Sequence, residues 1–95
     1  MKFAFIIMGE DFHPENDRAA IHGGTAQIIG VSSLDEACKE AIKLKGEGIN
    51  CIELCGAFGP ESAMRVIDAV QNSLPVGYVK HFPIQDDIYR KVFGE

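Results

Sequence analysis

The chain has 95 residues, of which 46% are hydrophobic and 24% are charged, and these proportions fit a single small globular domain. Its net charge of −5 and its nine scattered Lys and Arg residues argue against binding to nucleic acid, which needs clustered basic side chains. The first apolar run, residues 3–8, is too short for a secretory signal or a membrane span, so we expect no membrane association. Three cysteines without the spacing of a disulfide framework indicate a cytoplasmic protein.

Residues 2–8, KFAFIIM, are continuously apolar, which predicts a strand that is covered on both faces. A long connection follows over residues 9–24. Pro14 suits the first position of a helix and the Gly pair at 23–24 suits its end, so we expect a short helix within residues 14–22. If the connection holds no crossover helix, the second strand, residues 25–31, would pair antiparallel at an edge of the sheet.

The next helix is the one that the sequence predicts most clearly. Ser33 and Glu36 have the spacing of a capping box, and Gly46 or Gly48 suits the end of the helix. An apolar stripe at helical spacing indicates the inward face, which consists of Leu34, Ala37, Cys38, Ala41 and Ile42.

Residues 49–54, INCIEL, predict the third strand, and residues 59–74 predict a second long helix with Pro60 at its first position. The inner face of this helix would consist of Ala63, Val66, Ile67, Val70 and Leu74. Residues 76–82 predict the fourth strand. Residues 84–93 predict a short closing helix, with acids in its first turn and bases in its last, as the helix dipole favours.

Strands that alternate with amphipathic helices predict an α/β fold. We expect a single domain over residues 1–95 with a mainly parallel four-stranded sheet and flanking helices. The elements would follow in the order strand, short helix, strand, helix, strand, helix, strand, helix. A chain of this length buries only about 60–65% of its unfolded surface, so we expect it to gain stability as a homo-oligomer.

The stretch CIELC, residues 51–55, places an acid inside the third strand. Cys51 and Cys55 would lie about 13 Å apart at about 3.3 Å per residue, too far for a disulfide or a shared metal ion, so we expect no metal site. In an apolar interior Glu53 needs a cationic or hydrogen-bonding partner, or else a place at a cleft or a subunit interface. The candidate partners are Lys80, His81, Arg18, His13 and His22.

Cys55 ends the third strand just before a helix, at the carboxyl edge of the sheet where α/β domains gather their ligands. We predict a catalytic role for Cys55 as nucleophile or acid–base group, with Glu53 or His81 as its proton partner. Cys55 could also be a small residue at a tight turn, and His81 a strand-end histidine without a catalytic role. The ligand-binding residues predicted around the loop are Gly56, Ala57, Phe58, Gly59 and Glu61, with Glu10 at the same edge and with His13 and Arg18 on a lid formed by the 9–24 connection.

Two of these predictions are qualified by simpler considerations. Glu61 stands in the first turn of a helix, where an acid complements the helix dipole without any ligand. The chain has no G-x-G-x-x-G after its first strand and no G-x-x-x-x-G-K-[ST], so we expect no dinucleotide or nucleoside triphosphate and assign no cofactor.

The segments ELCGAFGPE, residues 53–61, and HPENDR, residues 13–18, resemble a family of small bacterial proteins that is catalogued as a domain of unknown function. The resemblance covers nearly the whole chain. It implies a small cytoplasmic α/β domain, and it brings no established reaction.

Two functions are therefore open. In the first, the chain is an enzyme or a binding domain for a small anionic or carbonyl-containing ligand at the carboxyl edge of the sheet, around residues 53–61. In the second, it is a non-catalytic module that self-associates or binds a partner. Glu53 would then form a structural ion pair, and the closing helix would offer an apolar patch of Ile88, Tyr89, Val92 and Phe93.

Overall fold

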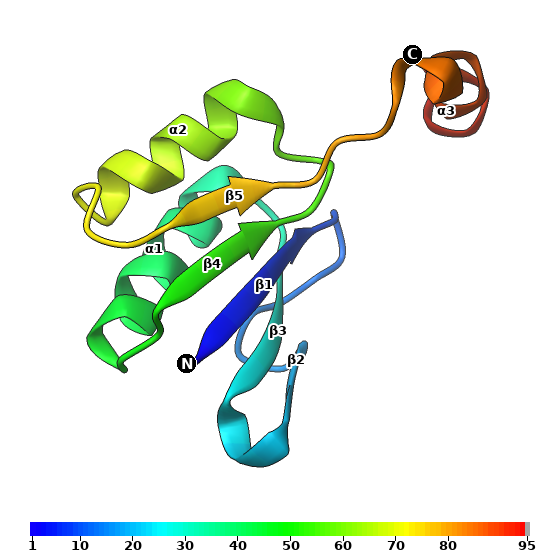
Figure 1. Cartoon of the computed structure of the whole chain (residues 1–95). Coiled ribbons are helices and arrows are strands. Elements are labelled where there is room, and N and C mark those ends of the chain that lie inside the picture. The colour runs from blue at the N-terminus through cyan, green and yellow to red at the C-terminus, as the bar shows by residue number, and fades with distance from the viewer. Residues whose placement is uncertain (95) are drawn as a thin grey trace.

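A computed structural model describes residues 1–94 of the chain (Figure 1). The strands are β1 (Phe3–Met8), β2 (Arg18–Ile21), β3 (Ala26–Val31), β4 (Cys51–Leu54) and β5 (Val76–Tyr78). The α-helices are α1 (Leu34–Gly46), α2 (Gly59–Ala69) and α3 (Asp86–Phe93), and the short 3-10 turns are η1 (His22–Gly24) and η2 (Pro83–Gln85).

The strands form one mixed sheet in the order β2-β3-β1-β4-β5. The central strand β1 pairs parallel with β3 and with β4, and β4 pairs parallel with β5. Only β2 runs antiparallel, along the outer edge of β3. The α/β class is as predicted, but the sheet has five strands where the sequence predicted four.

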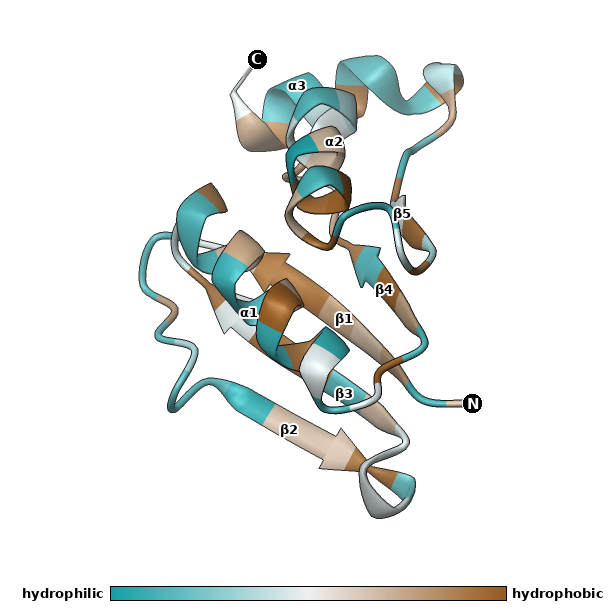
Figure 2. Cartoon of the chain, turned by 90° about the vertical axis from the view of Figure 1, so that its left-hand side faces the viewer, coloured by the Kyte–Doolittle hydropathy of each residue, from teal (hydrophilic) through white to brown (hydrophobic). Residues whose placement is uncertain are grey.

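The helices α1 and α2 lie side by side on one face of the sheet and build the core against it (Figure 2). Strand residues alternate between faces, so every second side chain of β1, β3 and β4 points toward these helices. The largest side chains that are fully buried there are Ile6, Ile29, Val31, Leu44, Ile52, Leu54, Val66 and Val70. In the hydropathy colouring, β1 is brown along most of its length and lies behind α1.

The start of α1 explains why the sequence predicted it well. The Ser33 hydroxyl accepts a hydrogen bond from the Glu36 amide at 3.1 Å, as an N-cap does. The Glu36 carboxylate reaches back one residue further than a capping box requires, to the amide and the hydroxyl of Ser32 at 2.7 and 2.9 Å. These hydrogen bonds lower the pKa of Glu36 below its ordinary value. One member of the predicted stripe was wrong, because Ile42 is 52% exposed and Leu44 takes the buried position.

The short helix predicted within residues 14–22 was also wrong, because that segment holds the edge strand β2. Pro14 lies in a single turn, in which the amides of Asn16 and Asp17 donate to the His13 carbonyl. The glycine pair does not end a helix but lies in the turn that joins β2 to β3. His22, Gly23 and Gly24 all have positive φ there, a conformation that glycine adopts without strain. The strand predicted at residues 25–31 then pairs parallel with β1.

Two later elements are shorter than the sequence predicted. Helix α2 ends at Ala69 rather than at residue 74, because Gln71 and Asn72 adopt positive φ angles of 58° and 51°. Strand β5 ends at Tyr78 rather than at residue 82. The Val79 amide still donates to the Leu54 carbonyl at 3.0 Å, but β4 ends there and offers no further ladder partner.

The C-terminal arm, which we define as residues 79–94, leaves the sheet and ends in α3. Every residue of the arm is exposed, and α3 stands beyond the carboxyl ends of the strands (Figure 1). No helix among residues 1–94 is long and apolar enough to cross a membrane.

Candidate functional site

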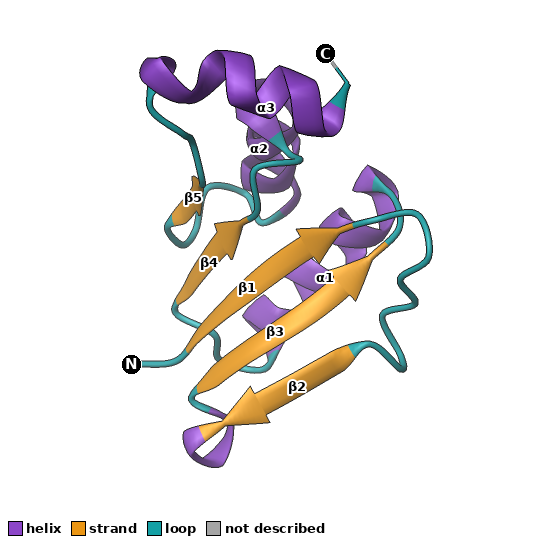
Figure 3. Ribbon diagram, turned by 90° about the vertical axis from the view of Figure 1, so that its right-hand side faces the viewer, coloured by secondary structure: helices purple, strands orange, loops and turns teal. Residues whose placement is uncertain are grey.

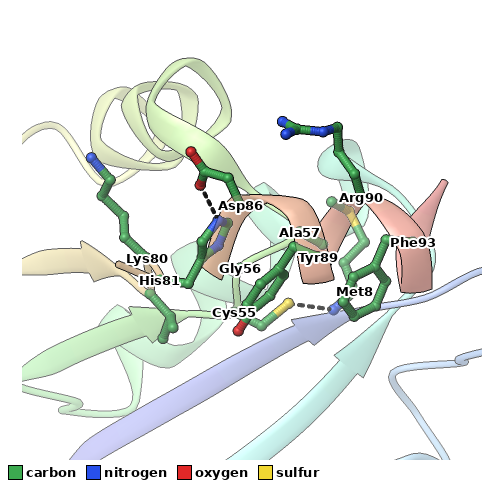
Figure 4. Close-up of a pocket in the computed structure, with 11 residues that line it drawn as sticks. Met8, Cys55, Gly56, Ala57, Lys80, His81, Asp86, Tyr89, Arg90 and Phe93 are labelled. Atoms are coloured by element: carbon green, nitrogen blue, oxygen red, sulfur yellow. Dashed lines mark hydrogen bonds and ion pairs between the residues drawn. The ribbon is translucent and has the colours of Figure 1, made fainter. Parts of the chain in front are cut away.

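A cleft of about 820 Å³ lies between the carboxyl edge of the sheet and the C-terminal arm (Figure 4). Its floor comes from the end of β1 and the loop after β4, and its other wall comes from the arm and α3. The lining residues are Met8, Cys55, Gly56, Ala57, Val79, Lys80, His81, Asp86, Tyr89, Arg90 and Phe93. The place agrees with the general rule that α/β domains bind ligands beyond the carboxyl ends of their strands.

The floor of the cleft is fixed by the core beneath it. The Cys55 amide donates to the Ile6 carbonyl at 3.0 Å, and the Phe58 amide closes the turn onto the Cys55 carbonyl at 3.1 Å. The Phe58 ring is buried in the core and anchors the loop. The Cys55 thiol faces the cleft, where its sulfur accepts a hydrogen bond from the Met8 amide at 3.4 Å.

The arm side of the cleft is held together by an aromatic stack. His81 Nε2 lies 2.8 Å from Asp86 Oδ1, so the imidazole and the carboxylate share a hydrogen bond. The His81 ring stacks on Tyr89 with centroids 3.7 Å apart, and Tyr89 stacks on Phe93 at 5.6 Å. Figure 4 shows the Tyr89 and Phe93 rings in the same cleft as Cys55 and Met8. These contacts give α3 its position relative to the residues just before it.

Cations gather at the two ends of the cleft. Lys80 extends from one end, and Arg90 extends from the other (Figure 4). Arg90 pairs with Asp87 on its own helix. Among residues 1–94 the only acidic side chain that lines the cleft is Asp86, and His81 already engages it. Two cations and one acid therefore line the cleft among residues 1–94, and Asp87, which does not line it, offsets the charge of Arg90.

Cys55 and His81 line the same cleft, as the sequence predicted, but no hydrogen bond joins them among residues 1–94. A thiol nucleophile with a histidine base needs the two side chains within about 2.6–3.2 Å, or somewhat more without substrate. Here the thiol is bound to the Met8 amide and the imidazole to Asp86. The arrangement suits binding better than nucleophilic catalysis, and the catalytic roles stay predictions.

Glu53 lies outside the cleft, on the face of the sheet that α1 and α2 leave uncovered. Its carboxylate accepts a hydrogen bond from the Cys51 thiol at 3.6 Å. It lies across β5, where Oε1 is only 2.8 Å from the position that a Cβ on Gly77 would take. None of its candidate cationic partners reaches it, and no ion pair to it forms within residues 1–94.

The contact between Cys51 and Glu53 affects the thiol. Burial raises the pKa of Cys51, and the neighbouring Glu53 charge and the hydrogen bond to it raise it further. Cys51 is therefore a protonated donor near neutral pH. Cys38 on α1 also has a raised pKa, mainly because it is partly buried.

The residues predicted on a lid lie elsewhere. Arg18 reaches α1, where its guanidinium lies 3.1 Å from Glu40 Oε1 and donates also to the Pro14 carbonyl. His13 and Glu10 are exposed and do not line the cleft. The 9–24 connection runs to the opposite edge of the sheet as β2, so it places no lid over the 55–57 loop.

The remaining residues of the predicted loop divide between two roles. Gly56 and Ala57 are exposed at the cleft. Phe58 is a core residue. Gly59 starts α2 with a φ of 69°, and Glu61 stands in the first turn of that helix, beside a shallow depression that Leu34, Ser62 and Arg65 also line.

The sequence did not predict that the last helix forms a wall of the site. Tyr89 and Phe93 were assigned to an apolar docking patch, and Arg90, Asp86 and Met8 were assigned to nothing. The available signal was the order of the elements: a chain that leaves the last parallel strand emerges at the same edge as Cys55. Among residues 1–94 no group of three or more His, Cys, Asp or Glu side chains is placed to hold a metal ion.

Comparison with known proteins gives one family. The model of the "Family of unknown function (DUF6506)" matches residues 1–94. No curated protein and no solved structure gives a significant match.

Proposed function

We propose that this chain, which belongs to the DUF6506 family of unknown function, binds a small organic anion in the cleft between the 55–57 loop and α3. The observation that carries the proposal is the composition of the cleft: basic groups at its ends and apolar side chains between them. Its volume of about 820 Å³ is within the range of small-molecule sites.

The charge of the ligand follows from the groups around the cleft. Lys80 and Arg90 stand at opposite ends, and Asp86 is already engaged by His81. A carboxylate or phosphate could approach Lys80, which forms no ion pair within residues 1–94, without meeting an unpaired acid on the described lining, whereas at Arg90 it would compete with Asp87. The partly enclosed position strengthens such a charged contact relative to open water.

Hydrogen-bond donors on the floor support the same assignment. The amides of Gly56 and Ala57 donate to no protein acceptor among residues 1–94, and both residues are exposed. They precede the eleven-residue helix α2, so they sit where backbone N–H groups face solvent and favour negative charge. An anionic oxygen would accept from them on the floor of the cleft.

The apolar lining indicates the rest of the ligand. Met8, Ala57 and Val79 contribute aliphatic surface, and Tyr89 and Phe93 contribute stacked rings. A flat ring or a short hydrocarbon chain would be covered by these side chains while its charged group met the cations. The proposed ligand is therefore an amphiphilic anion, such as an aromatic carboxylate, rather than a bare inorganic ion.

An NMR titration of the full chain with benzoate tests the proposal, with neutral benzamide as the matched probe. We expect benzoate to shift the amide signals of Gly56, Ala57 and His81 and benzamide to shift them little. Replacing both Lys80→Ala and Arg90→Ala should weaken benzoate binding about tenfold, or about 1.4 kcal/mol. Lys39→Ala on α1, away from the cleft, should leave it unchanged.

Three results would contradict the proposal. Benzoate shifts that spread over the whole surface at millimolar concentration would show no site. Equal shifts from benzoate and benzamide would show that the charge is not recognised. Binding that survives the Lys80 and Arg90 substitutions would place the site elsewhere.

A further inference from the structure

One face of the sheet has no helix on it among residues 1–94, and we call it the bare face (Figure 3). The strand positions on it follow from the alternation of side chains and from the register of the strands: Phe3, Phe5, Ile7, Ala19, Ile21, Ala26, Ile28, Gly30, Cys51, Glu53 and Gly77. Phe3, Ile21 and Ile28 are exposed there. Parallel strands are normally covered on both faces, so this surface lacks a layer.

Helix α3 is a second apolar surface without a partner. Its eight residues are fewer than the roughly 12–15 that an isolated helix needs to be stable in water, so it depends on packing. Tyr89 turns toward the cleft, but Ile88, Val92 and Phe93 are well exposed, and Phe82 and Ile84 before the helix are more exposed still. Within residues 1–94 it packs on η2 and on the aromatic stack, and it contributes no residue to the buried core.

The two surfaces lie on the same side of the molecule. Figure 1 shows α1 and α2 on one side of the sheet and α3 displaced to the other. Figure 3 looks onto the bare face and shows α3 above the sheet, beyond the carboxyl ends of the strands and in front of α2. Helix α3 therefore projects past its own bare face and cannot cover it, but it would meet a molecule that packs there.

We propose that the bare face docks a second copy of this chain, with α3 of each copy packed on the bare face of the other. Such an interface is isologous: a two-fold axis places the same helix and the same sheet surface on both sides. It supplies the missing layer to the sheet and the missing partner to α3, and a helix layered on a sheet face is a standard packing.

Charge complementarity supports a second copy as the occupant. Glu53 is the one charged residue among the strand positions of the bare face, and it forms no ion pair within residues 1–94. Covering it with apolar surface alone would strand a desolvated carboxylate. Helix α3 carries a complement in Lys91, which lies beside Ile88 around the helix and forms no ion pair among residues 1–94, whereas Arg90 lines the cleft and pairs with Asp87.

Sedimentation equilibrium of the full chain tests the proposal, with three single substitutions compared. The wild-type chain should sediment as a dimer of the 10.4 kDa protomer at micromolar concentration. Ile88→Glu on α3 and Ile28→Glu on the bare face should each weaken the dimer at least tenfold. Ile42→Glu is the matched control: Ile42 is 52% exposed and Ile88 54%, but Ile42 lies on α1.

The outcomes are distinguishable from misfolding, because α3 contributes nothing to the core, so Ile88→Glu should keep the far-ultraviolet dichroism that α1, α2 and the sheet supply. A wild-type chain that stays monomeric at micromolar concentration would overturn the proposal, and a different protein would then have to cover the two surfaces. A dimer that survives both substitutions would overturn it as well, and so would a dimer that Ile42→Glu weakens equally. Benzoate binding by the Ile88→Glu monomer separates this proposal from the function of the cleft.

Discussion

The two faces of the sheet are built from the same strands and differ in what lies on them. Toward α1 and α2, residues such as Ile6, Ile52 and Leu54 have no exposed surface. On the bare face, their neighbours Phe3 and Ile28 each remain 41% exposed, and Glu53 stands among them without a cationic partner in the described part of the chain, residues 1–94. The covered face stabilises the domain, and the bare face, together with α3, is the surface available for association.

This difference shows where function can reside in so small a domain. One helical layer is enough to bury a core, so the second face and the C-terminal arm are released from that task. Helix α3 has a part in both sites. One flank of the helix closes the cleft of its own chain, and the other is proposed to pack on the bare face of the second copy. The following substitutions test that division.

The largest expected effect is on the covered face. Ile52→Ala should lower the free energy of unfolding by about 2–5 kcal/mol, because it leaves a cavity in the core. Ile28→Ala should lower it by less than about 1 kcal/mol, because Ile28 is already partly in water. Urea unfolding in the monomeric Ile88→Glu background measures both. If both substitutions lowered the free energy of unfolding equally, the two faces would contribute equally to the stability of the core.

The next effect concerns a spot of the bare face that the Phe12 ring covers. Phe12 packs over Gly30, where an added Cβ would stand 2.8 Å from the ring. Gly30→Ala should therefore lower stability by about 1–3 kcal/mol through overpacking. In a Phe12→Ala background most of this loss should vanish, and a double-mutant cycle measures that coupling. Additive losses would mean that the ring does not occupy this place.

A smaller effect should appear at Glu53. If Lys91 of a second copy pairs with it, Glu53→Gln should weaken the dimer about tenfold, or about 1.4 kcal/mol. Sedimentation at low and high salt measures the change, and added salt should reduce the wild-type advantage. Glu61→Gln, in the exposed first turn of α2, is the control and should leave the dimer unchanged. A stronger dimer from Glu53→Gln would refute the ion pair.

The smallest effect is the pH dependence of the α1 cap. Hydrogen bonds from Ser32 hold the pKa of Glu36 below its ordinary value of 4.5. A depressed pKa stabilises the fold above the unfolded value, and this contribution is lost as the pH falls through the folded value. Glu36→Gln should therefore lower the urea midpoint slightly at neutral pH and leave it unchanged near pH 2. A difference between wild type and variant that persists at that pH would contradict the assignment.

The sequence predicted the elements whose signals are local. Helix α1 has its Ser33 cap, α2 has Pro60 at its start, and the apolar strands β1, β3 and β4 lie where they were expected. It failed where pairing across the chain decides. Residues 18–21 include Ala19 and Ala20, which favour a helix, so their local preference does not predict a strand. They form a strand because they pair with β3 and because the 22–24 turn, with its positive φ angles, brings the two segments together.

The candidate site divides in the same way. Cys55, Gly56 and Ala57 were found because they follow a strand and precede a helix along the chain. The wall from α3 was missed because its position depends on where the arm leaves the sheet after Tyr78. Glu53 was expected to have a cationic or hydrogen-bonding partner, or to face a cleft or a subunit interface. Within residues 1–94 its partner is the Cys51 thiol, a hydrogen-bonding group that was not among the candidates, and its carboxylate lies over Gly77. Strand spacing gives the face of a side chain, but not its partner.

One measurement tests most directly the claim that α3 and the bare face meet in a second copy. The chain has no tryptophan, so Ile88→Trp introduces a single fluorescent reporter on α3, and Ile42→Trp introduces the matched control on α1. We expect Trp at 88 to emit at short wavelength at high protein concentration and to shift to the red on dilution, while Trp at 42 stays red throughout. Emission from position 88 that matches position 42 at every concentration would contradict the account.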